Sequence, residues 1–576
     1  MPSLTGGQII VRALEDAGVS LTFGIPGTHN IELYDALATS DRVRPVLVTD
    51  EQSASFMADA VWRASGRLGC VNVVPGAGLT HAMSGIAEAF MDNVPLLVLG
   101  CGIRRDTGMA FQLHDVDQLA MVAPITKARY RPDTGRGAYT VILEACRLAR
   151  EGVPGPVMVE IPANLYLFKH EVDLPPRASE ARPRDASVPD DSVARAAELL
   201  GQAKRPLIYV GLGAAGAGSS LVELAERLDA PVASTIQGKG VFPESHPLSL
   251  WPGFGDAAPA FVRSIARDCD ATLAIGCRFG EVATASYGLV PPSPLIHVDI
   301  SPDSIGRNYP TTLGVVADAA AFVRALLPRL PRRAPDEKLR ARISAGHAEV
   351  AAERLKHASA SRVTPAKLLD ALQTHFGKDT IFTTDSGNGT FIAMECLRLD
   401  GAGKLLAPVD YSCMGYAVPA AIGAKLARPD TPVVSLAGDG AFLMTGLELL
   451  TAAHEGVAVA VFVFRDRELA QIAQFQDVAL NRKTCSELPD YDLSAICRGV
   501  GVECLTLDRD AGIQEVLAKV SDVNGAGRPV VVDVGIDYSQ KTYFTQGVVK
   551  TNLKRLPWRD RLRFIGRAVG RRITGG

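Results

Sequence analysis

Short apolar segments alternate with longer amphipathic segments along most of the chain. Buried strands of parallel sheets are typically continuous apolar runs, and amphipathic segments with a period near 3.6 are typical of helices. This alternation predicts βαβ units, and hence an α/β protein built on doubly wound parallel sheets. In the first third, we expect strands at 46–49, 71–74, 96–99 and 157–161, with helices at 53–64 and 79–90 between them.

Two polar, proline-rich segments interrupt the pattern at 175–191 and 327–362, although the second also contains a helical pattern at 337–357. Such segments are typical of connections between domains. Each block between them has strand patterns of its own, at 206–210, 272–275 and 295–299 in the middle and at 380–384, 433–436, 458–464 and 530–534 in the third. We therefore predict domains at 1–174, 190–330 and 360–545, followed by a tail at 546–576.

The composition narrows the class of protein. Hydrophobic residues make up 47% of the 576 residues and charged residues 21%, which excludes a disordered chain. The net charge of −3 argues against a nucleic-acid binder. The ten cysteines are scattered without a CxxC pair, which favours reduced thiols and a cytoplasmic location. The N-terminus lacks a signal-peptide pattern, and no apolar run reaches the length of a membrane span.

The tail differs in charge from the rest of the chain. Residues 550–576 contain nine Lys or Arg and one acid, so the tail carries +8 and the remainder −11. Its apolar residues recur at helical spacing, which predicts a basic amphipathic helix. Such a helix either packs on the acidic body of its own protein or lies on an anionic membrane surface. The apolar stripe comprises Trp558, Leu562, Ile565, Val569 and Ile573.

The third block contains a candidate metal site. One apolar strand pattern ends in Gly438-Asp439-Gly440, and the next ends at Arg465-Asp466. Ligands of open α/β sheets lie at the carboxyl ends of the strands, and two carboxylates there suit a hard cation such as Mg²⁺. An ordinary Asp-Gly turn is the alternative interpretation.

The spacing of these residues resembles the thiamine-diphosphate (ThDP) signature, in which GDG is followed by an Asn-Asn pair. The resemblance implies that Asp439, Asp466 and the backbone carbonyl of Glu468 hold Mg²⁺. Arg465-Asp466 departs from Asn-Asn, but Asp keeps the oxygen ligand.

The resemblance extends over about residues 5–540 and is closest to acetolactate-synthase-like enzymes, the group with pyruvate oxidase and benzaldehyde lyase. The matching motifs include FGIPGTHN, TDEQSASF, VVPGAGLTH, FQLHDVDQ, PITK, GCRFGE, TTDSGNGT and SCMGYAVPAA. It implies three domains (pyrimidine-binding, central and diphosphate-binding) and an active site shared across a homodimer, often within a homotetramer.

The resemblance also assigns roles around the cofactor. Glu51 is expected to hydrogen-bond the aminopyrimidine ring and relay acid–base catalysis, although a structural salt bridge is the ordinary reading of such a residue. Met414 is expected to prop the bent cofactor, and the Ser412 carbonyl to accept from its amine. Contacts to the diphosphate are expected from Ser386, Gly387, Asn388, Gly389, Thr390, Gly438, Gly440 and Ala441.

Candidate substrate residues come from several loops. His29 is a candidate proton shuttle or simply a hydrogen-bonded loop residue, and Gln112 a candidate catalytic residue. Val282 stands where acetolactate synthases have an arginine that recognises the second 2-oxo acid, and Phe475 where they have a selective tryptophan. A different, more apolar donor or acceptor is therefore expected. The remaining substrate-pocket candidates are Thr28, Phe111, Lys127, Leu469 and Ile472, with His114 nearby.

The central block leaves a second cofactor open. Its glycine-rich turn after a strand is a weak dinucleotide signal, and several positions resemble flavin contacts of acetolactate synthases and pyruvate oxidases. Two alternatives therefore stay open: the central domain binds FAD, or it binds no cofactor. The candidate residues are Gly211, Gly213, Arg278, Phe279, Asp299 and Asp318.

The expected activity is decarboxylation of a 2-oxo acid, with transfer or release of the acyl or aldehyde unit. An acyloin lyase or carboligase of benzaldehyde-lyase type is one alternative. A flavin-dependent 2-oxo acid oxidase with a membrane-binding tail is another, and a non-catalytic binding or regulatory homologue is a third.

Overall fold

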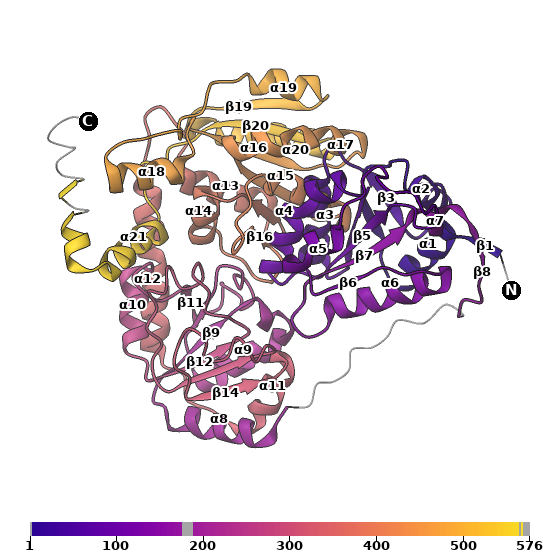
Figure 1. Ribbon diagram of the computed structural model, residues 1–576. Helices are drawn as coiled ribbons and strands as arrows, with labels where there is room; N and C mark the ends of the chain where they lie inside the picture. Colours follow the sequence, from indigo (N-terminus) through magenta and orange to yellow (C-terminus); the bar gives the residue numbers. More distant parts are fainter. Residues whose placement is uncertain (1–2, 176–187, 564–565, 568–576) are drawn as a thin grey trace.

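The computed structural model describes residues 3–175, 188–563 and 566–567. Three domains each enclose a six-stranded sheet in which every strand pair is parallel, with helices on both faces (Figure 1). The predicted α/β fold with three doubly wound parallel sheets is confirmed. All ten cysteines lie in the described residues and are free thiols. None of the described helices is both long and apolar enough to cross a bilayer.

The N-terminal domain has the strand order β3-β2-β4-β5-β7-β6. A short antiparallel pair, β1 (Ser3–Thr5) and β8 (Lys169–Glu171), ties its two ends together. The six strands are β2 (Leu21–Gly24), β3 (Arg44–Leu47), β4 (Gly69–Val73), β5 (Leu96–Gly102), β6 (Ala128–Tyr130) and β7 (Pro156–Pro162). The helices are α1 (Gly6–Asp16), α2 (Ile31–Leu37), α3 (Glu51–Ser65), α4 (Ala77–Met91), α5 (Gln118–Met121), α6 (Gly135–Arg150) and α7 (Ala163–Leu167).

The central domain has the order β11-β10-β9-β12-β13-β14. Its strands are β9 (Pro206–Val210), β10 (Val232–Ser234), β11 (Ser249–Pro252), β12 (Ala271–Ile275), β13 (Leu295–Asp299) and β14 (Leu313–Val316). Its helices are α8 (Asp190–Gln202), α9 (Gly218–Leu228), α10 (Ala260–Arg267) and α11 (Ala319–Leu326), and α12 (Glu337–Lys356) follows as the predicted helix of the second connection. Most of the first connection, predicted at 175–191, lies outside the described residues.

The C-terminal domain has the order β16-β15-β17-β18-β20-β19. Its strands are β15 (Ile381–Thr384), β16 (Leu405–Leu406), β17 (Val433–Gly438), β18 (Ala460–Arg465), β19 (Glu503–Leu507) and β20 (Val530–Gly535). Its helices are α13 (Pro365–Phe376), α14 (Asn388–Cys396), α15 (Ala417–Ala427), α16 (Asp439–Thr445), α17 (Leu449–His454), α18 (Ala470–Leu480), α19 (Leu493–Gly499) and α20 (Ile513–Gly525).

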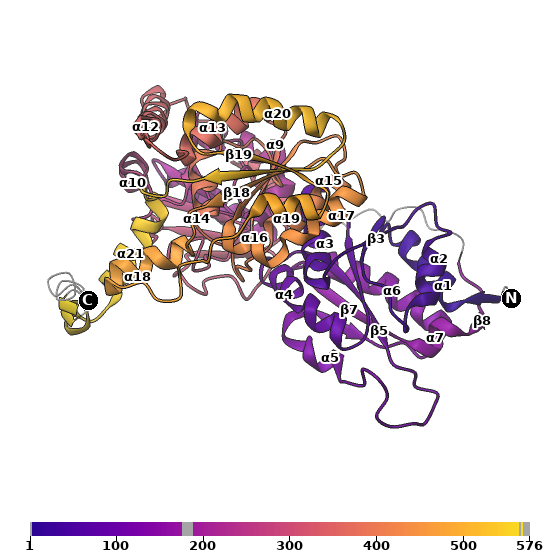
Figure 2. The same ribbon diagram turned by 90° about the horizontal axis from the view of Figure 1, so that it is seen from above.

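Helices α3 and α15 join the N-terminal and C-terminal domains (Figures 1 and 2). One hydrophobic core runs through both helices and continues into the two sheets. A Cβ atom at Gly423 would lie 2.4 Å from the Met57 carbonyl oxygen, so the helices approach more closely than any larger residue permits. This contact fixes the loops of one domain relative to those of the other.

The predicted tail begins inside a docked helix. Helix α21 (Tyr543–Arg555) starts three residues before the predicted boundary at 546 and packs on the central domain. Lys550 and Lys554 both pair with Asp256, and a Cβ atom at Gly547 would lie 2.2 Å from Ala257. The basic start of the tail thus packs on its own protein. Trp558 and Leu562 are exposed, whereas Ile565, Val569 and Ile573 lie outside the described residues.

Candidate active site

Asp439 and Asp466 lie at the carboxyl ends of neighbouring parallel strands, as the sequence predicts. Gly438, the last residue of β17, pairs with Phe464 of β18. The backbone N–H of Arg467 donates to Asp439 Oδ2 at 2.8 Å, which folds the turn after β18 onto Asp439. Burial raises the pKa of Asp439, and burial together with the negative charge of Asp439 raises the pKa of Asp466 to about 7. Such crowding of buried carboxylates is relieved by a cation.

The third expected ligand is a carbonyl in the same turn. The Glu468 carboxylate pairs with Lys483, and its backbone carbonyl stays the candidate ligand. Two carboxylates and a carbonyl are an all-oxygen set, which suits Mg²⁺. These residues fit the divalent cation that the sequence resemblance implies.

The loop after β15 forms the second half of this corner. It includes Ser386 and Gly387, and α14 begins at Asn388 with no side chain capping its first turn. Gly387 has φ +135°, a conformation that favours glycine. The free N–H groups of a helix start are suited to a phosphate anion. Gly389 and Thr390 continue the helix, and β15 and β17 are neighbours, so the loop and the metal corner share one sheet edge.

Small residues also form the floor of the corner. A Cβ atom at Gly440 would lie 2.7 Å from Leu469 and 3.6 Å from Met414. Gly438 precedes α16, and Ala441 is buried in it. Ser412 Oγ lies 2.8 Å from Ser386 Oγ, which places the two predicted cofactor loops together. The arrangement fits a diphosphate and its cation.

Glu51 begins α3 and is buried. A Cβ atom at Gly78 would lie 2.8 Å from Glu51 Oε1, so glycine keeps space beside the carboxylate. The ring of His81, which the sequence analysis did not single out, lies 3.8 Å from Glu51 Oε2 and 3.1 Å from Asp50 Oδ2. Within the described residues, no hydrogen bond or ion pair joins Glu51 to the diphosphate loop or the metal corner.

Three predicted substrate residues share one cavity of about 380 Å³ in the N-terminal domain: Thr28, His29 and Gln112. Burial and the neighbouring ring of His114 lower the pKa of His29, so its imidazole is neutral near pH 7. The Gln112 amide donates to the Arg104 carbonyl at 2.9 Å. Phe111 is fully exposed on the same loop with φ +57°.

Lys127 lies away from this cavity. Its Nζ donates to the Leu148 and Glu151 carbonyls at 2.6 Å, which satisfies the end of α6. It precedes β6, whereas Glu51 and His29 follow strands, so it lies at the opposite edge of the sheet. The structure therefore does not bring Lys127 to the predicted substrate pocket of its own chain. The short PITK motif carries no information on which sheet edge it occupies.

A second cavity, of about 240 Å³, opens beside the cofactor loops. It brings Val282 and Phe475 together with Ser386, Gly387 and Ser412. Phe544 and Val548 of α21 line its wall, so the C-terminal helix contributes to this cavity. Leu469 and Ile472 lie at the start of the neighbouring helix α18, where Ile472 is half exposed.

The largest cavity, about 760 Å³, lies where the central domain meets the other two. Five of the six flavin candidates line it: Gly211, Gly213, Arg278, Asp299 and Asp318. A Cβ atom at Gly211 would lie 2.1 Å from the Gly276 carbonyl, so this glycine serves loop packing. Phe279, in contrast, is buried in the domain core against Tyr209 and His297.

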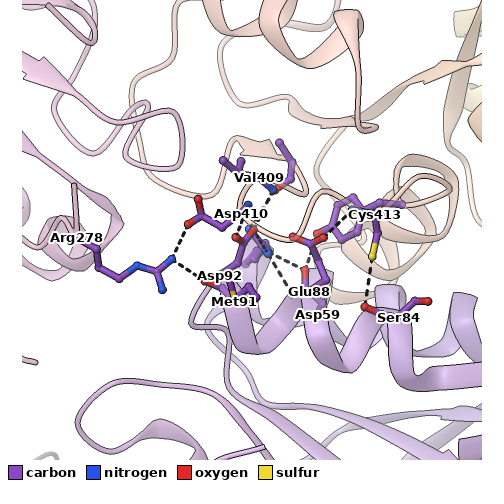
Figure 3. Close-up of polar contacts among 12 residues, drawn as sticks. Asp59, Ser84, Glu88, Met91, Asp92, Arg278, Val409, Asp410 and Cys413 are labelled. Atoms are coloured by element: carbon purple, nitrogen blue, oxygen red, sulfur yellow. Dashed lines mark hydrogen bonds and ion pairs between the residues drawn. The ribbon is translucent and has the colours of Figure 1, made fainter. Parts of the chain in front are cut away.

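Buried carboxylates that are not among the predicted site residues support these loops. Glu448 accepts from the Thr49 hydroxyl at 2.6 Å, two residues before Glu51. Asp385 accepts from the N–H groups of Gly415 and Ala417, and Glu88 from that of Cys413 (Figure 3). Their partners lie 30 or more residues away in sequence, so local motifs could not reveal them. For Glu88, an acid in the otherwise apolar helix α4 was a signal in the sequence.

Comparisons with known proteins agree with this geometry. The chain matches three family models of thiamine pyrophosphate (TPP) enzymes, where TPP is another name for ThDP. The models describe an N-terminal TPP binding domain at residues 4–121, a central domain at 193–326 and a C-terminal TPP binding domain at 385–534. It is 31% identical to the "Probable acetolactate synthase large subunit" of Methanocaldococcus jannaschii over 93% of this chain and 92% of the relative.

Two further relatives show the range of named activities. Identity is 30% to the acetolactate synthase isozyme 3 large subunit of Escherichia coli, covering 94% of this chain and 96% of the relative. It is 35% to the "Probable 2-ketoarginine decarboxylase AruI" of Pseudomonas aeruginosa, covering 82% and 83%.

Proposed function

Because this chain belongs to the thiamine pyrophosphate enzymes, as an acetolactate synthase-like carboligase or decarboxylase, we propose that it decarboxylates a 2-oxo acid with ThDP and Mg²⁺ and transfers or releases the remaining unit. The observation that carries the proposal is the paired carboxylates of Asp439 and Asp466 beside the glycine-rich start of α14. Bound ThDP supplies a carbon nucleophile and an electron sink.

Each residue of the site has a defined role in the proposed reaction. Asp439, Asp466 and the Glu468 carbonyl hold the cation, and the N–H groups after Gly387 bind the diphosphate. The Glu51 carboxylate exchanges a proton with the cofactor from a buried position. Since Glu51 makes no described contact with the diphosphate loop of its own chain, we propose that a homodimer or homotetramer completes the site.

The cavity beside the cofactor loops favours an extended substrate. Val282 and Phe475 contribute apolar side chains to its lining. Its charged lining residues, among those described, are Glu281 and Asp410, and Asp410 is paired with Arg278. Glu281 is exposed and without a described ion pair, so it can receive a cation at the far end of a substrate. The name of the Pseudomonas relative, which refers to 2-ketoarginine, supports a cationic side chain.

CO₂ release from a panel of 2-oxo acids tests the proposal. We expect 2-ketoarginine to be turned over faster than pyruvate and than a branched apolar 2-oxo acid, with activity requiring both ThDP and Mg²⁺. Glu281→Gln should raise KM for 2-ketoarginine and leave KM for the apolar acid unchanged. No CO₂ from any member of the panel would contradict the decarboxylase assignment.

The His29 cavity favours a second candidate, an acyloin lyase or carboligase. A neutral imidazole beside Gln112 can take a proton from a hydroxyl group, which acyloin cleavage requires. Aldehyde release from an acyloin without CO₂, lost in His29→Ala, would support this candidate over the first.

The largest cavity has a volume suited to a nucleotide-type ligand such as FAD. Two of its predicted contacts already have backbone partners, because Asp299 accepts from the Ser301 N–H and Asp318 from the Ala321 N–H. We propose that flavin, where bound, occupies this cavity. The visible absorbance of the purified protein tests it, and the same spectrum with a 2-oxo acid added tests the oxidase alternative through flavin bleaching.

A further inference from the structure

The segment that carries Ser412 and Met414 is hydrogen-bonded to a helix of another domain. Its backbone N–H groups donate to two carboxylates on one face of α4: Val409 to Asp92 at 3.3 Å, Asp410 to Asp92 at 3.0 Å, and Cys413 to Glu88 at 2.9 Å. Figure 3 shows Glu88 and Asp92 reaching from this helix to the segment. Three backbone donors in five residues therefore depend on the N-terminal domain.

The C-terminal domain holds the other end of the same segment. Asp385 accepts from the N–H groups of Gly415 at 2.8 Å and Ala417 at 3.0 Å. Within the part held by α4, between Asp410 and Cys413, Ser412 has φ +65°, which is costly for a residue with a side chain. Such a conformation persists only where neighbouring contacts enforce it.

The α4 anchor is deeply buried. Glu88 is 0% exposed and Asp92 1% exposed. Arg63 donates to Asp92 at 2.9 Å and also pairs with Asp59, so one guanidinium faces several acids. Breaking such a network is expensive, because an unpaired buried donor or charge loses its solvation without compensation.

The surroundings of Glu88 favour its protonated form. Burial and the negative charge of Asp92 raise the pKa of Glu88 to about 9, against the opposing effects of the Cys413 N–H and Arg63. Glu88 is therefore a neutral carboxyl group near pH 7. The titratable and charged groups that interact with it are Arg63 of α3, Asp92 at the end of α4, and Cys413 and Tyr416 of the C-terminal domain. Asp59 and Asp385 act on the neighbouring Cys413.

We propose that Glu88 and Asp92 are positioning residues, which set the place of Ser412 and Met414 for the cofactor from across the domain boundary. This inference rests on the proposed ThDP-dependent function. It means that the cofactor segment is aligned with the same helix, α4, whose first turn includes Gly78 beside Glu51. One helix thereby supports both a proton-transfer residue and a cofactor-binding segment.

Three variants test the inference. Glu88→Ala removes the acceptor for the Cys413 N–H, whereas Glu88→Gln keeps a neutral acceptor of similar size. Glu160→Gln is the matched control, because Glu160 is a buried acid of the same domain that pairs with Arg131 and does not contact the segment. The measurements are the Kd for ThDP with Mg²⁺ by calorimetry and amide hydrogen exchange of residues 405–418 without cofactor.

We expect Glu88→Ala to weaken ThDP binding about tenfold, as for loss of one buried hydrogen bond, and to speed exchange in 405–418. Glu88→Gln and the control should stay near wild type at pH 7. Wild-type affinity should fall as the pH rises through about 9, where Glu88 ionises beside Asp92, and Glu88→Gln should lack this fall.

Two different failures are distinguishable. If the wild type binds no ThDP, the proposed function fails, while the exchange data still report on the anchor. If the wild type binds ThDP and Glu88→Ala binds it equally well with unchanged exchange, the positioning role is overturned and the function stands. Should Glu88→Ala not fold, the pH dependence of wild type and Glu88→Gln decides, and identical profiles overturn the inference.

Discussion

Asp439 and Asp466 follow different strands, yet the charge of the first helps to raise the pKa of the second to about 7. The two carboxylates thus meet at one sheet edge, and neither has a described ion pair. The nearby Arg465, which pairs with Asp490 and Asp533, offsets the raised pKa of Asp439 only in part. Such a carboxylate pair is poorly balanced alone and well suited to a divalent cation.

The side chain at position 466 is expected to supply an oxygen ligand to Mg²⁺, and its negative charge is not required. Asp466→Asn should retain Mg²⁺-dependent ThDP binding, because the amide oxygen replaces the carboxylate. Asp466→Ala should lose at least about tenfold in Mg²⁺ affinity. Calorimetric titration of each variant with Mg²⁺ at saturating ThDP checks both, and equal affinity in all three proteins would remove Asp466 from the site.

The protonation of Glu88 predicts a pH dependence of stability. Its folded pKa of about 9 lies above the ordinary value of 4.5, so folding takes up a proton between these pH values. The contribution of Glu88 to stability therefore falls as the pH rises from about 5 to 9. Glu88→Gln should gain stability relative to wild type over that range. Urea unfolding at several pH values measures this, and a constant difference would contradict the assignment.

The aromatic stack of α21 predicts that this helix matters for both stability and substrate binding. Phe544 stacks on Phe391 at 4.2 Å between ring centroids and lines the cavity proposed to receive substrate. Phe544→Ala should cost about 3 kcal/mol of unfolding free energy and raise KM. Leu562→Ala is the control, since Leu562 is exposed, and it should alter neither quantity.

Membrane contact by the end of the chain stays a prediction. Trp558 and Leu562 are exposed beside basic residues, whereas α21 is held by Asp256. Removing residues 558–576 should leave the fold intact and reduce sedimentation with anionic vesicles. Equal soluble fractions of full-length and shortened protein would contradict membrane contact.

The sequence predicted most accurately the strands whose positions are determined by a local run of apolar residues. The strands expected at 206–210 and 295–299 match β9 and β13, since both are buried apolar runs. The strand expected at 46–49 lies two residues earlier, as β3 (Arg44–Leu47). It ends before Thr49, whose N–H donates to the Glu448 side chain. The three-residue strand β10 (Val232–Ser234) is too short for a clear pattern.

The same distinction holds for the site. Asp439 and Asp466 could be placed because strand ends meet at one edge. Glu88 and Asp385 could not, because their partners are backbone groups of a segment distant in sequence, and such contacts leave no periodicity. Lys127 was assigned by motif alone, and its partners at the end of α6 depend on tertiary packing.

The central claim is that Glu51 and the Asp439–Asp466 corner form a ThDP-dependent active site. Its most direct test is CO₂ release from the 2-oxo acid panel by wild type and Glu51→Gln, each with saturating ThDP and Mg²⁺. Glu51→Gln should lose at least about 100-fold in kcat, because a carboxamide cannot exchange the proton. Unchanged turnover in Glu51→Gln would contradict it.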